Sequence, residues 1–524
     1  MIQARPTDEG LIVLDYGSQY TLLIARRLRE IGIYAEVIDG QAEHPPADFN
    51  FHGIILSGGP DSVTEVGSRT LPGWVTQSQK PVLGICYGMQ LLTESSGGKV
   101  AAASKREYGQ ATLKIDPASV PDRIKPLVKD LPSSQTVWMS HGDTVQGIES
   151  SFSTFGLTNS DVIAAVAHKT LPYIGLQFHP EVHHSEHGDK ILENFARHIC
   201  EAPLNWQDAD RLEATLKYVK EQVGDGHVLM AVSGGVDSTV AAVLLERALS
   251  PEQVTPVLVD NGLLRKDEAQ RVLDRFKAMG VPNVQLLEAQ DRFLGKLKGV
   301  SDPEQKRKII GNTFIEEFEQ FAKSLSQKFT HLGQGTLYPD VIESAGHGAG
   351  SKVIKSHHNV GGLPEHLALD LVEPFRFLFK DEVRQIGVDL GIPKELVFRH
   401  PFPGPGLGVR ILGDISEDKV RILQDADEIY INKLREAGLY DEVWQAFAVL
   451  LPVKTVGVMG DNRTYQWTCA IRAVNATDGM TAGVSNLPLE FLVSVSDEIV
   501  RNVDGINRVV YDITTKPPAT IEWE

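Results

Sequence analysis

Short apolar runs alternate with helical patterns along the chain from Gly10 to about Cys200. The runs read LIVLD, GIILS, PVLGI and IGLQF, and one of the helical patterns covers residues 20–31. Such runs between amphipathic helices are typical of strands and helices wound into a mostly parallel sheet. The pattern therefore predicts a doubly wound α/β domain over residues 8–201.

A second doubly wound domain is predicted after the polar stretch APLNWQDAD at residues 202–210. The run HVLMAV precedes a glycine-rich loop, an apolar helical pattern at residues 239–249 and a strand pattern at residues 254–259. This order of strand, helix and strand repeats the logic of the first domain. We assign residues 202–399 to the second domain.

Glycine and proline mark a third change near Arg399. The stretch RHPFPGPGLG holds three prolines and three glycines in ten residues, so it cannot form the interior of a helix or of a central strand. Mixed helix and strand patterns follow, which predicts an α+β domain over residues 400–524. The expected fold class is α/β, with two doubly wound, mostly parallel-sheet domains followed by a smaller α+β domain.

Length and composition favour a soluble protein of several domains. A chain of 524 residues exceeds the size at which one hydrophobic core keeps growing. No apolar run approaches the roughly 18 residues that a membrane span needs, and the N-terminus lacks the apolar core of a secretory signal. The three cysteines, Cys86, Cys200 and Cys469, are too dispersed for a disulfide framework. We expect a reducing, cytoplasmic setting and no membrane partner.

The formal net charge of -18 argues against a nucleic-acid partner, because it repels phosphate backbones. The best basic cluster is short and consists of Lys306, Arg307 and Lys308. This cluster can hold one phosphate group, or it can be the solvated face of a charged helix.

Residues 84–88 read Gly-Ile-Cys-Tyr-Gly, between a strand-like PVL and a helical MQLLTESS. This is the pattern of a sharp strand-to-helix turn, in which the glycines allow close packing and the central residue projects above the sheet. A thiolate at Cys86 would gain from the positive end of the following helix. The pentapeptide alone fits a nucleophile and a buried structural cysteine about equally.

A histidine and a glutamate lie two residues apart in the run YIGLQFHPEV, where His179 and Glu181 are expected at the end of a strand. Strand residues two apart point to the same side, so the carboxylate can orient the imidazole. Cys86 would then attack a carboxamide, His179 would move the proton, and Glu181 would fix the imidazole tautomer. The Ser-Gly-Gly-Pro loop at residues 57–60 can join the backbone N–H of Tyr87 in stabilising an oxyanion.

The motifs GGP, GICYGMQ and FHPEV occur in this order, and residues 10–200 thereby resemble the class I glutamine amidotransferases. The resemblance implies hydrolysis of glutamine to glutamate and ammonia through a thioester on Cys86. It also implies that a loop before the histidine strand, here residues 140–143, touches the bound glutamine. The expected oxyanion and glutamine-binding residues are Gly59, Tyr87, Gln90 and Asp143.

Three further histidines, His183, His184 and His187, follow Glu181 closely. Their number suggests a metal site, but their spacing matches no strong zinc pattern. We expect a polar surface loop here.

A second chemical motif, SGGVDST, lies directly between a predicted strand and a predicted helix. Its small residues can turn their N–H groups toward an anion at the helix N-terminus, which makes it a candidate phosphate cradle. The Walker pattern, GxxxxGKS or GxxxxGKT, is missing, so the motif is not that of a Walker-type NTPase. A bare glycine-rich turn is the other interpretation. The motif comprises Ser233, Gly234, Gly235, Val236, Asp237, Ser238 and Thr239.

SGGVDST resembles the pyrophosphate-binding loop of the N-type ATP pyrophosphatases, which split ATP between the α and β phosphates and adenylylate a substrate. The resemblance implies that the loop binds pyrophosphate with Mg²⁺ near Asp237. It places the VDNGL segment, with Val259, beside the adenine, and it adds the charge of Lys380 in FKDEVR. The LGQGTLYPD run, which contains Gly335, is similar to a nucleotide-lining strand and loop.

Three stretches of the C-terminal third, HPFPGPGLGVR, GVMGDNR and DITTKPPATIEWE, bear on the amide acceptor. Together with the two halves before them they resemble the GMP synthetase family along essentially the whole chain. This resemblance implies amination of xanthosine 5'-monophosphate (XMP), and a C-terminal dimerisation domain that makes a homodimer and completes the XMP site. It places Arg307 on a mobile lid with Lys308. The expected XMP-binding residues are Arg307, Arg410, Lys516 and Glu522.

One departure from the family is the segment GVSN at residues 483–486, which lacks an expected tryptophan, so we expect different local packing there. Among other enzymes, a tRNA-thiolating pyrophosphatase would need a sulfur-relay cysteine near the loop and a basic RNA surface, and the sequence offers neither. A non-catalytic sensor of glutamine or ATP is the alternative from another class. The presence of Cys86, His179, Glu181 and Asp237 argues against it.

Overall fold

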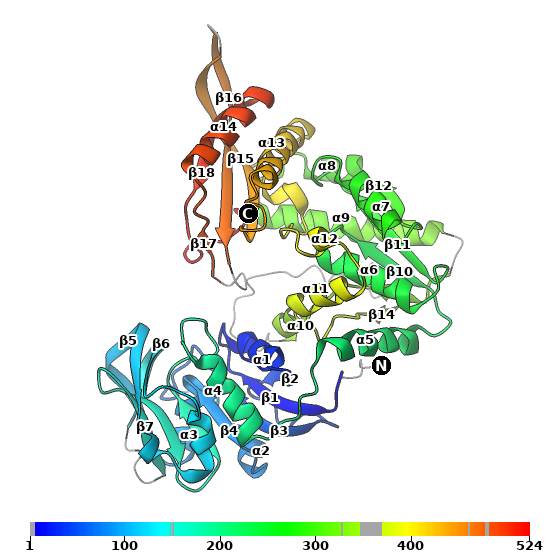
Figure 1. Ribbon diagram of the computed structural model, residues 1–524. Helices are drawn as coiled ribbons and strands as arrows, with labels where there is room; N and C mark the ends of the chain where they lie inside the picture. Colours follow the sequence, from blue (N-terminus) through cyan, green and yellow to red (C-terminus); the bar gives the residue numbers. More distant parts are fainter. Residues whose placement is uncertain are drawn as a thin grey trace. The chain divides into compact units, whose positions relative to one another are not determined.

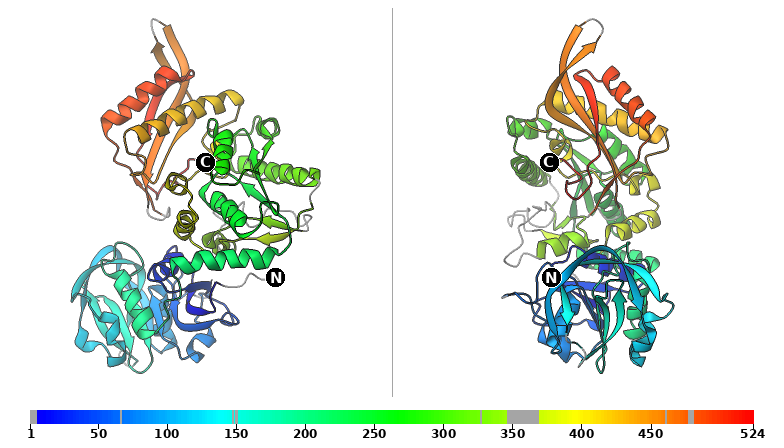
Figure 2. Two further views of the ribbon diagram at one scale, coloured as in Figure 1. Left: turned by 45° about the vertical axis from the view of Figure 1, so that its right-hand side comes forward. Right: turned by 90° about the vertical axis from the view of Figure 1, so that its left-hand side faces the viewer.

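A computed structural model describes residues 6–65, 67–146, 148, 151–325, 328–345, 369–459, 462–476 and 481–524. The described chain divides into two compact units, which meet in the sequence between Arg211 and Leu212. Each unit has its own sheets (Figures 1 and 2). The second unit contains the sheets of both residues 202–399 and residues 400–524, so the division into three domains stays a prediction.

A nine-stranded sheet forms the centre of the first unit. Five strands run parallel in the order β2-β1-β3-β4-β9, and the sheet continues with antiparallel pairings through β8-β7-β5-β6. The expectation of a mostly parallel sheet therefore describes only the first five strands. Short connections join β7 to β8 and β8 to β9, and they enforce antiparallel pairing because a parallel pair needs a long crossover. The strands are β1 Glu9–Asp15, β2 Ala35–Asp39, β3 Asn50–Leu56, β4 Val82–Ile85, β5 Lys99–Ile115, β6 Ser134–Gln146, β7 Phe152–Thr158, β8 Ile163–His168 and β9 Tyr173–Leu176.

Continuous apolar runs identify the inner strands of this sheet. The runs LIVLD, GIILS and PVLGI form most of β1, β3 and β4, and β4 is buried along its whole length. Strands that are buried on both faces need helices on both faces. Helix α1, Thr21–Glu30, packs against β1 and β2, and α3, Tyr87–Ser95, packs against β4 and β9. The other α-helices of this unit are α2, Gly73–Gln77, and α4, Gly188–Asn194.

The second unit contains a wholly parallel sheet in the order β12-β11-β10-β13-β14. Strand β11 lies on one side of β10 and β13 lies on the other, so the winding reverses direction at β10. Ligands of open α/β sheets bind outside the carboxyl ends of the strands at such a point. The strands are β10 Val228–Val232, β11 Val254–Asp260, β12 Gln285–Glu288, β13 His331–Gly333 and β14 Asp370–Val372.

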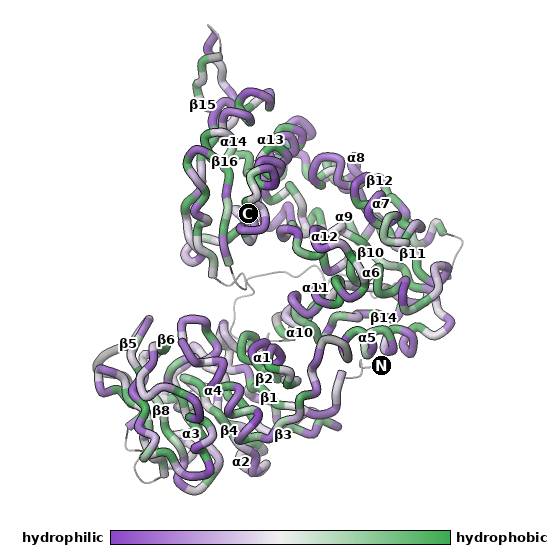
Figure 3. Tube along the Cα trace, in the orientation of Figure 1, coloured by the Kyte–Doolittle hydropathy of each residue, from purple (hydrophilic) through white to green (hydrophobic). Residues whose placement is uncertain are grey.

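Helices surround this parallel sheet, and their tubes carry both hydrophilic and hydrophobic colouring in Figure 3, as expected for helices with one buried face. Helix α6 directly follows β10, and α11 packs against α6. Helix α5, Asp208–Val223, precedes the sheet in the sequence. The remaining helices of this part are α6 Val236–Ala248, α7 Glu268–Ala278, α8 Gln290–Leu297, α9 Pro303–Ser324, α10 Tyr338–Ala345, α11 Lys380–Asp389 and α12 Lys394–Val397.

A four-stranded sheet and two long helices make up the C-terminal part of the second unit. Strands β15, Gln445–Met459, and β16, Asn462–Asn475, form a long antiparallel hairpin, and β18, Ile506–Asp512, runs parallel to β16. Helices α13, Glu417–Glu436, and α14, Leu489–Asn502, share one apolar core with Ala446, Ala448 and Leu450 of β15. The alternate residues Phe447 and Val449 lie in a second core with Ile521. This arrangement fits the predicted α+β fold.

The GVSN segment forms a short strand in this sheet. Its first residues, Gly483–Val484, make β17, which pairs antiparallel with β16. Ser485 is buried, and its N–H donates to the carbonyl of Ala473 at 3.0 Å. Backbone pairing thus secures the segment. Within the part of the chain that the structure describes, no helix has the length and apolar character needed to cross a bilayer.

Candidate active sites

Cys86 stands in the sharp turn between β4 and α3. Its φ and ψ of 50° and -105° lie outside the common regions for an L-residue, and such strain clusters at functional sites. A Cβ on Gly84 would lie 2.5 Å from the main chain of Gly88, and one on Gly88 would lie 2.4 Å from the carbonyl oxygen of Leu56. Both glycines are therefore required for the turn. The backbone N–H of Cys86 donates to Leu176 at 2.7 Å and ties the turn to β9.

His179 and Glu181 meet beside this turn, although not in the way that the sequence suggested. Strand β9 ends at Leu176, so both residues lie beyond it and strand alternation does not align them. The turn that follows the strand does, and it brings Nδ1 of His179 within 2.7 Å of Oε1 of Glu181. Both side chains are buried, and Tyr20 packs edge-on against the imidazole at 5.1 Å between ring centroids.

The carboxylate of Glu181 favours the protonated form of the His179 imidazole. Burial alone lowers the pKa of His179, but the carboxylate of Glu181 and hydrogen bonding to Cys86 outweigh burial and hold the pKa well above its usual value. A protonated imidazole next to a cysteine stabilises the thiolate, which is the nucleophilic form. Cys86 and His179 can therefore form a thiolate–imidazolium ion pair, and the carboxylate of Glu181 can orient the imidazolium.

The loop after β3 lies against the same residues. A Cβ on Gly58 would lie 3.1 Å from Cε1 of His179, and one on Gly59 would lie 2.8 Å from the carbonyl oxygen of Tyr16 and 3.3 Å from the ring of Tyr87. Ser57 anchors the loop, because its Oγ accepts the N–H of Tyr16 at 3.0 Å. The structure thus brings the two expected oxyanion residues, Gly59 and Tyr87, together.

The expected glutamine-binding residues border Cys86, but residues 140–143 are not a loop. They lie within β6, whose alternating burial marks a half-buried strand. Sγ of Cys86 lies 3.6 Å from the carbonyl oxygen of Ser140, and Nε2 of Gln90 donates to the carbonyl oxygen of Asp143 at 3.4 Å. Gln90 and Asp143 therefore contact each other next to the turn.

Gln177 is a residue of this site that sequence reasoning missed. It is fully buried, and its Nε2 lies 3.7 Å from Sγ of Cys86. The signal was a polar side chain in the apolar run IGLQF, two residues before His179.

The second motif lies at the carboxyl end of β10, where the winding reverses. Strand β10 ends at Val232 and α6 begins at Val236, so only residues 233–235 form a loop and the rest of the motif is the first turn of the helix. Gly234 has a φ of 70°, and a Cβ there would lie 2.6 Å from Val272. The loop therefore needs glycine at this position.

Hydroxyl groups hold the loop in shape. The Oγ atoms of Ser233 and Ser238 lie 3.0 Å apart, and Oγ of Ser238 also accepts the N–H of Ser233 at 3.1 Å. Thr239 donates its hydroxyl to the carbonyl of Gly235 at 2.7 Å. The loop is thus preformed at the N-terminus of α6, where the helix dipole favours an anion.

Asp237 provides the carboxylate of this second site. Its Oδ2 lies 3.2 Å from Nζ of Lys380, the first residue of α11, and its Oδ1 is buried without a hydrogen-bond partner in the described structure. Such an oxygen fits Mg²⁺, which is bound through one or two carboxylates together with substrate phosphates. Gly335 lies against the same turn, since a Cβ there would be 3.2 Å from the main chain of Asp237. Val259 is buried near the carboxyl end of the neighbouring strand β11.

Two of the expected XMP-binding residues are paired with each other. Arg410 is fully buried and donates through Nε and Nη2 to both carboxylate oxygens of Glu522, at 3.1 and 2.8 Å. Gln445, which the sequence reading passed over, also donates to Glu522 at 2.7 Å. Its signal was only a polar residue at the start of an apolar strand. The three side chains form one polar cluster, in which Arg410 and Gln445 are buried.

The basic cluster on α9 does not present one common face. Lys306 is fully buried, donates to the carbonyl of Ile411 at 2.7 Å and forms an ion pair with Glu524. Arg307 donates to the main-chain oxygen of the same terminal residue. Lys308, in contrast, is exposed, and its ion pair with Glu304 of its own helix is a long contact of 3.9 Å. Arg307 and Lys308 thus stand on a helix of 22 residues and not on a loop.

Lys516 and the histidines after Glu181 complete the survey of expected residues. Lys516 pairs through its backbone with Ala482, at 3.0 and 2.8 Å. His184 packs against Trp138 with 4.6 Å between ring centroids. Among the described residues, no group of three or more His, Cys, Asp or Glu side chains is arranged to hold a metal ion.

Family models match the chain in three places. The model for glutamine amidotransferase class-I matches residues 12–199, the model for NAD synthase matches residues 209–299, and the model for the GMP synthase C terminal domain matches residues 432–523. The first match contains the Cys86 turn. The second contains the SGGVDST motif with Asp237, which we call the Asp237 loop. The third contains Lys516 and Glu522.

Full-length relatives then decide the family. The chain is 51% identical over 519 residues to a glutamine-hydrolysing GMP synthase of Vibrio parahaemolyticus, with 99% of both chains covered. It is equally similar, at 51% over 519 residues, to the enzyme of that name from Fusobacterium nucleatum, with 98% of this chain and 99% of the other covered. The chain belongs to the glutamine-hydrolysing GMP synthases.

In a GMP synthase with this geometry, Glu181→Gln should lower the kcat of glutamine hydrolysis roughly 10³-fold, because the imidazole loses the carboxylate that orients it. It should also change the pH profile. The carboxylate raises the pKa of His179, so its removal lowers that pKa, and the imidazolium proton is lost at a lower pH. We expect the alkaline limb of the kcat/KM profile to move to lower pH.

The matched control is Glu186→Gln, which changes an exposed carboxylate that accepts the N–H of Thr136. Its pH profile should follow that of the unchanged protein. An active Glu181→Gln protein with an unmoved alkaline limb would contradict the role given to Glu181.

Proposed function

We propose that the protein hydrolyses glutamine at Cys86 and uses the ammonia to convert XMP to GMP at the Asp237 loop, with ATP cleaved to AMP and pyrophosphate. The observation that carries this proposal is a complete nucleophile, base and carboxylate set in the same chain as a preformed phosphate loop. Membership in the glutamine-hydrolysing GMP synthases supports it for the whole chain.

In the first half-reaction the thiolate of Cys86 attacks the carboxamide carbon of glutamine. The N–H groups of Gly59 and Tyr87 stabilise the oxyanion, and the imidazolium of His179 donates its proton to the leaving ammonia. Water activated by the neutral imidazole then hydrolyses the thioester to glutamate. Glu181 keeps the imidazole oriented through both steps, which the 2.7 Å contact supports.

In the second half-reaction the residue roles follow from charge and position. The backbone of residues 233–235 and the helix dipole of α6 hold the β and γ phosphates, and Lys380 neutralises negative charge beside them. Bound Mg²⁺ would screen the phosphates and stabilise the leaving pyrophosphate, and Asp237 is the residue that would hold it. Val259 and Gly335 line the nucleotide. An oxygen of XMP attacks the α phosphate, and ammonia then displaces AMP from the resulting adenylate.

For XMP, we assign Arg307 and Lys516 to the phosphate, where cations are needed, and Arg410 with Glu522 to the remainder of the nucleotide. The bidentate pair supports a fixed position for the carboxylate of Glu522, which can accept hydrogen bonds from a purine or ribose. Because glutamine hydrolysis needs Cys86 as a free thiol, a reducing cytoplasm suits the enzyme.

The deciding assay supplies ATP, Mg²⁺ and XMP and compares ammonia with glutamine as the nitrogen source. GMP should form with either source, with AMP and pyrophosphate in equal amounts. Release of ADP and inorganic phosphate would overturn the role of the Asp237 loop. GMP formation with ammonia but not with glutamine would overturn the role of Cys86.

We also propose that the chain forms a homodimer through the β15–β16 hairpin. Val456 lies directly opposite Tyr465, and Val458 lies two residues farther along the same face, so the three side chains share one face. They are 50%, 62% and 73% exposed for Val456, Tyr465 and Val458, respectively. A contiguous exposed apolar face of this kind marks an interaction surface.

Lysine at both Val458 and Tyr465 should therefore weaken dimerisation by roughly 100-fold, since it places charge in an apolar interface. Light scattering after size-exclusion chromatography would measure this as a shift from the mass of two chains to that of one. The control is Leu171→Lys, the same kind of change in an exposed turn of the first unit. A dimer that survives in the double variant at the same concentration would exclude the hairpin as the interface.

A further inference from the structure

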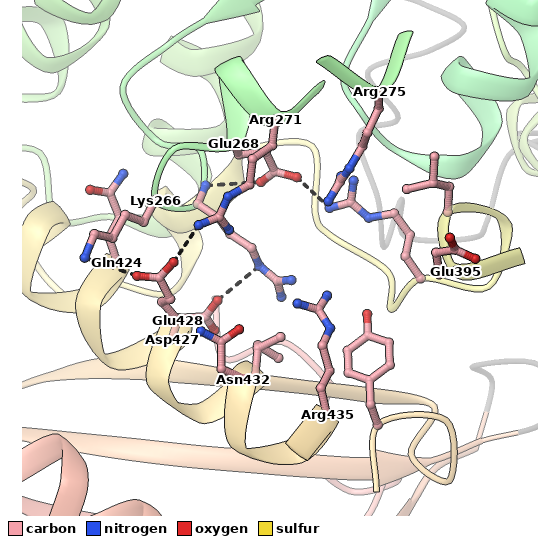
Figure 4. Close-up of a pocket in the computed structure, with 15 residues that line it drawn as sticks. Lys266, Glu268, Arg271, Arg275, Glu395, Gln424, Asp427, Glu428, Asn432 and Arg435 are labelled. Carbon is pink, nitrogen blue, oxygen red and sulfur yellow. Dashed lines mark hydrogen bonds and ion pairs between the residues drawn. The ribbon is translucent and has the colours of Figure 1, made fainter. Parts of the chain in front are cut away.

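A cavity of about 60 Å³ in the second unit is lined mainly by charged side chains (Figure 4). We call it the arginine pocket, and it lies among α7, α13 and the segment that follows α12. Six cations line it: Arg265, Lys266, Arg271, Arg275, Arg399 and Arg435. Only four carboxylates do so, Glu268, Glu395, Asp427 and Glu428. In a chain with a net charge of -18, this local excess of positive charge needs a reason.

Some of these cations are neutralised by the carboxylates of the pocket. Arg271 and Lys266 share Glu428, with contacts of 2.6 and 3.1 Å, and Figure 4 shows both turned toward it. Arg399 lies 2.6 Å from Glu268. These side chains use their charge within the protein, so they do not by themselves indicate a ligand.

Three arginines of the pocket have side-chain N–H donors without an acceptor among the described residues. The side chains of Arg275 and Arg435 form no ion pair or hydrogen bond with any residue that the structure describes, and the guanidinium of Arg435 lies over the ring of Tyr440, 4.8 Å from its centroid. Arg265 lies 3.0 Å from Asp427, yet its Nη2 is buried without a hydrogen-bond partner in the described chain. Burial and the nearby charge of Arg399 lower the pKa of Arg275. The three guanidinium groups line one cavity and keep N–H donors that no described protein group accepts.

The nature of the anion follows from shape and charge. We propose that the arginine pocket binds a phosphate group between Arg265, Arg275 and Arg435. Guanidinium groups bind phosphate through paired N–H donors, and two arginines without a carboxylate partner match a phosphate dianion. At roughly 10–15 Å³ for each water, a cavity of about 60 Å³ holds about four to six water-sized groups, which suits the five heavy atoms of a phosphate. The phosphate can be free or the 5'-phosphate of a nucleotide.

This site is distinct from the phosphate loop, although Arg275 and Arg399 also line a small neighbouring cavity with Gly234 and Thr239 of the loop motif. Arg399 lines the pocket and donates through Nη1 to the carbonyl oxygen of Gly234. None of the residues of SGGVDST lines the pocket itself. A test must therefore distinguish a phosphate in the pocket from one on the loop.

Crystals soaked in tungstate, a phosphate analogue with strong anomalous scattering, would locate the anion directly. We expect an anomalous peak within hydrogen-bonding distance of Arg275 and Arg435, in addition to any peak on the loop. This experiment uses the unchanged protein, so it does not depend on the folding of a variant. A peak on the loop alone would overturn the proposal.

Calorimetric titration with inorganic phosphate and with AMP would measure the affinity and identify the source. Arg275→Gln and Arg435→Gln should each weaken binding at the pocket about 10- to 100-fold, the effect of losing a hydrogen bond to a charged group. Tighter binding of AMP than of phosphate would indicate a nucleotide, and equal binding would indicate free phosphate. The control, Arg421→Gln, removes an exposed arginine of α13 that pairs with Asp418 outside the pocket. Equal affinities in the pocket variants and the control would refute the site.

Discussion

Replacing Cys86 by alanine should lower glutamine-dependent GMP synthesis by at least about 10⁴-fold and leave the ammonia-dependent reaction unchanged. The thiolate is the only group of this site that can form the thioester, and His179 with Glu181 serves it. The second site needs ammonia but not its source. Measuring GMP formation with glutamine and with ammonium chloride at a fixed pH gives both rates from one preparation.

The matched control is Cys200→Ala, because Cys200 is also a buried free thiol of the first unit. Burial raises the pKa of its thiol well above the usual range, so it stays protonated and inert. This variant should keep both activities. Glutamine use that survives in Cys86→Ala would rule out the assignment of the nucleophile, and a parallel loss of the ammonia reaction would mean a wider structural effect.

Asp237→Asn should lower GMP synthesis about 10²- to 10³-fold with either nitrogen source, because it removes a charge that acts directly on the reacting phosphates. The amide keeps the size of the side chain, so the turn at the start of α6 should persist. It loses the anionic oxygen that fits Mg²⁺ and the ion pair with Lys380. Glutamate release from Cys86 should continue, and it can be measured in the same samples.

Asp389→Asn serves as the control, since this carboxylate lies at the far end of α11 and accepts a hydrogen bond from Gln385 at 2.9 Å. Synthesis should be unaffected there. If Asp237→Asn retained full synthesis, the carboxylate would have no part in phosphate chemistry. Cys86→Ala should therefore lose glutamine hydrolysis and keep ammonia-dependent synthesis, whereas Asp237→Asn should lose synthesis and keep glutamine hydrolysis.

The sequence predicted the inner strands well because parallel strands are buried on both faces and read as unbroken apolar runs. Strands β1, β4 and β10 are examples, and each lies where its run predicted. The antiparallel part of the first sheet was harder to see. Strand β6, Ser134–Gln146, buries only alternate residues, so its polar positions resembled a loop at residues 140–143.

Local motifs could be predicted for the same reason that they fold locally. The turn at Cys86 and the loop at residues 233–235 each join a buried strand to the helix that follows it, and glycine marks both. Long-range pairings leave no such mark. Arg410 meets Glu522 across 112 residues, and no periodicity encodes that contact. The unpaired guanidinium groups of Arg275 and Arg435 likewise could not be predicted, because they line one cavity only after α7 and α13 have packed in the folded chain.

The ion pair between Lys306 and Glu524 joins a helix in the middle of the second unit to the last residue of the chain. A fully buried ammonium without a counter-charge is costly, so this ion pair favours the folded position of the segment that also carries Glu522. The pairs Lys306–Glu524 and Arg410–Glu522 thus attach one short segment to the rest of the unit at two points. Loss of either carboxylate would leave a buried cation unpaired and loosen the attachment of the other.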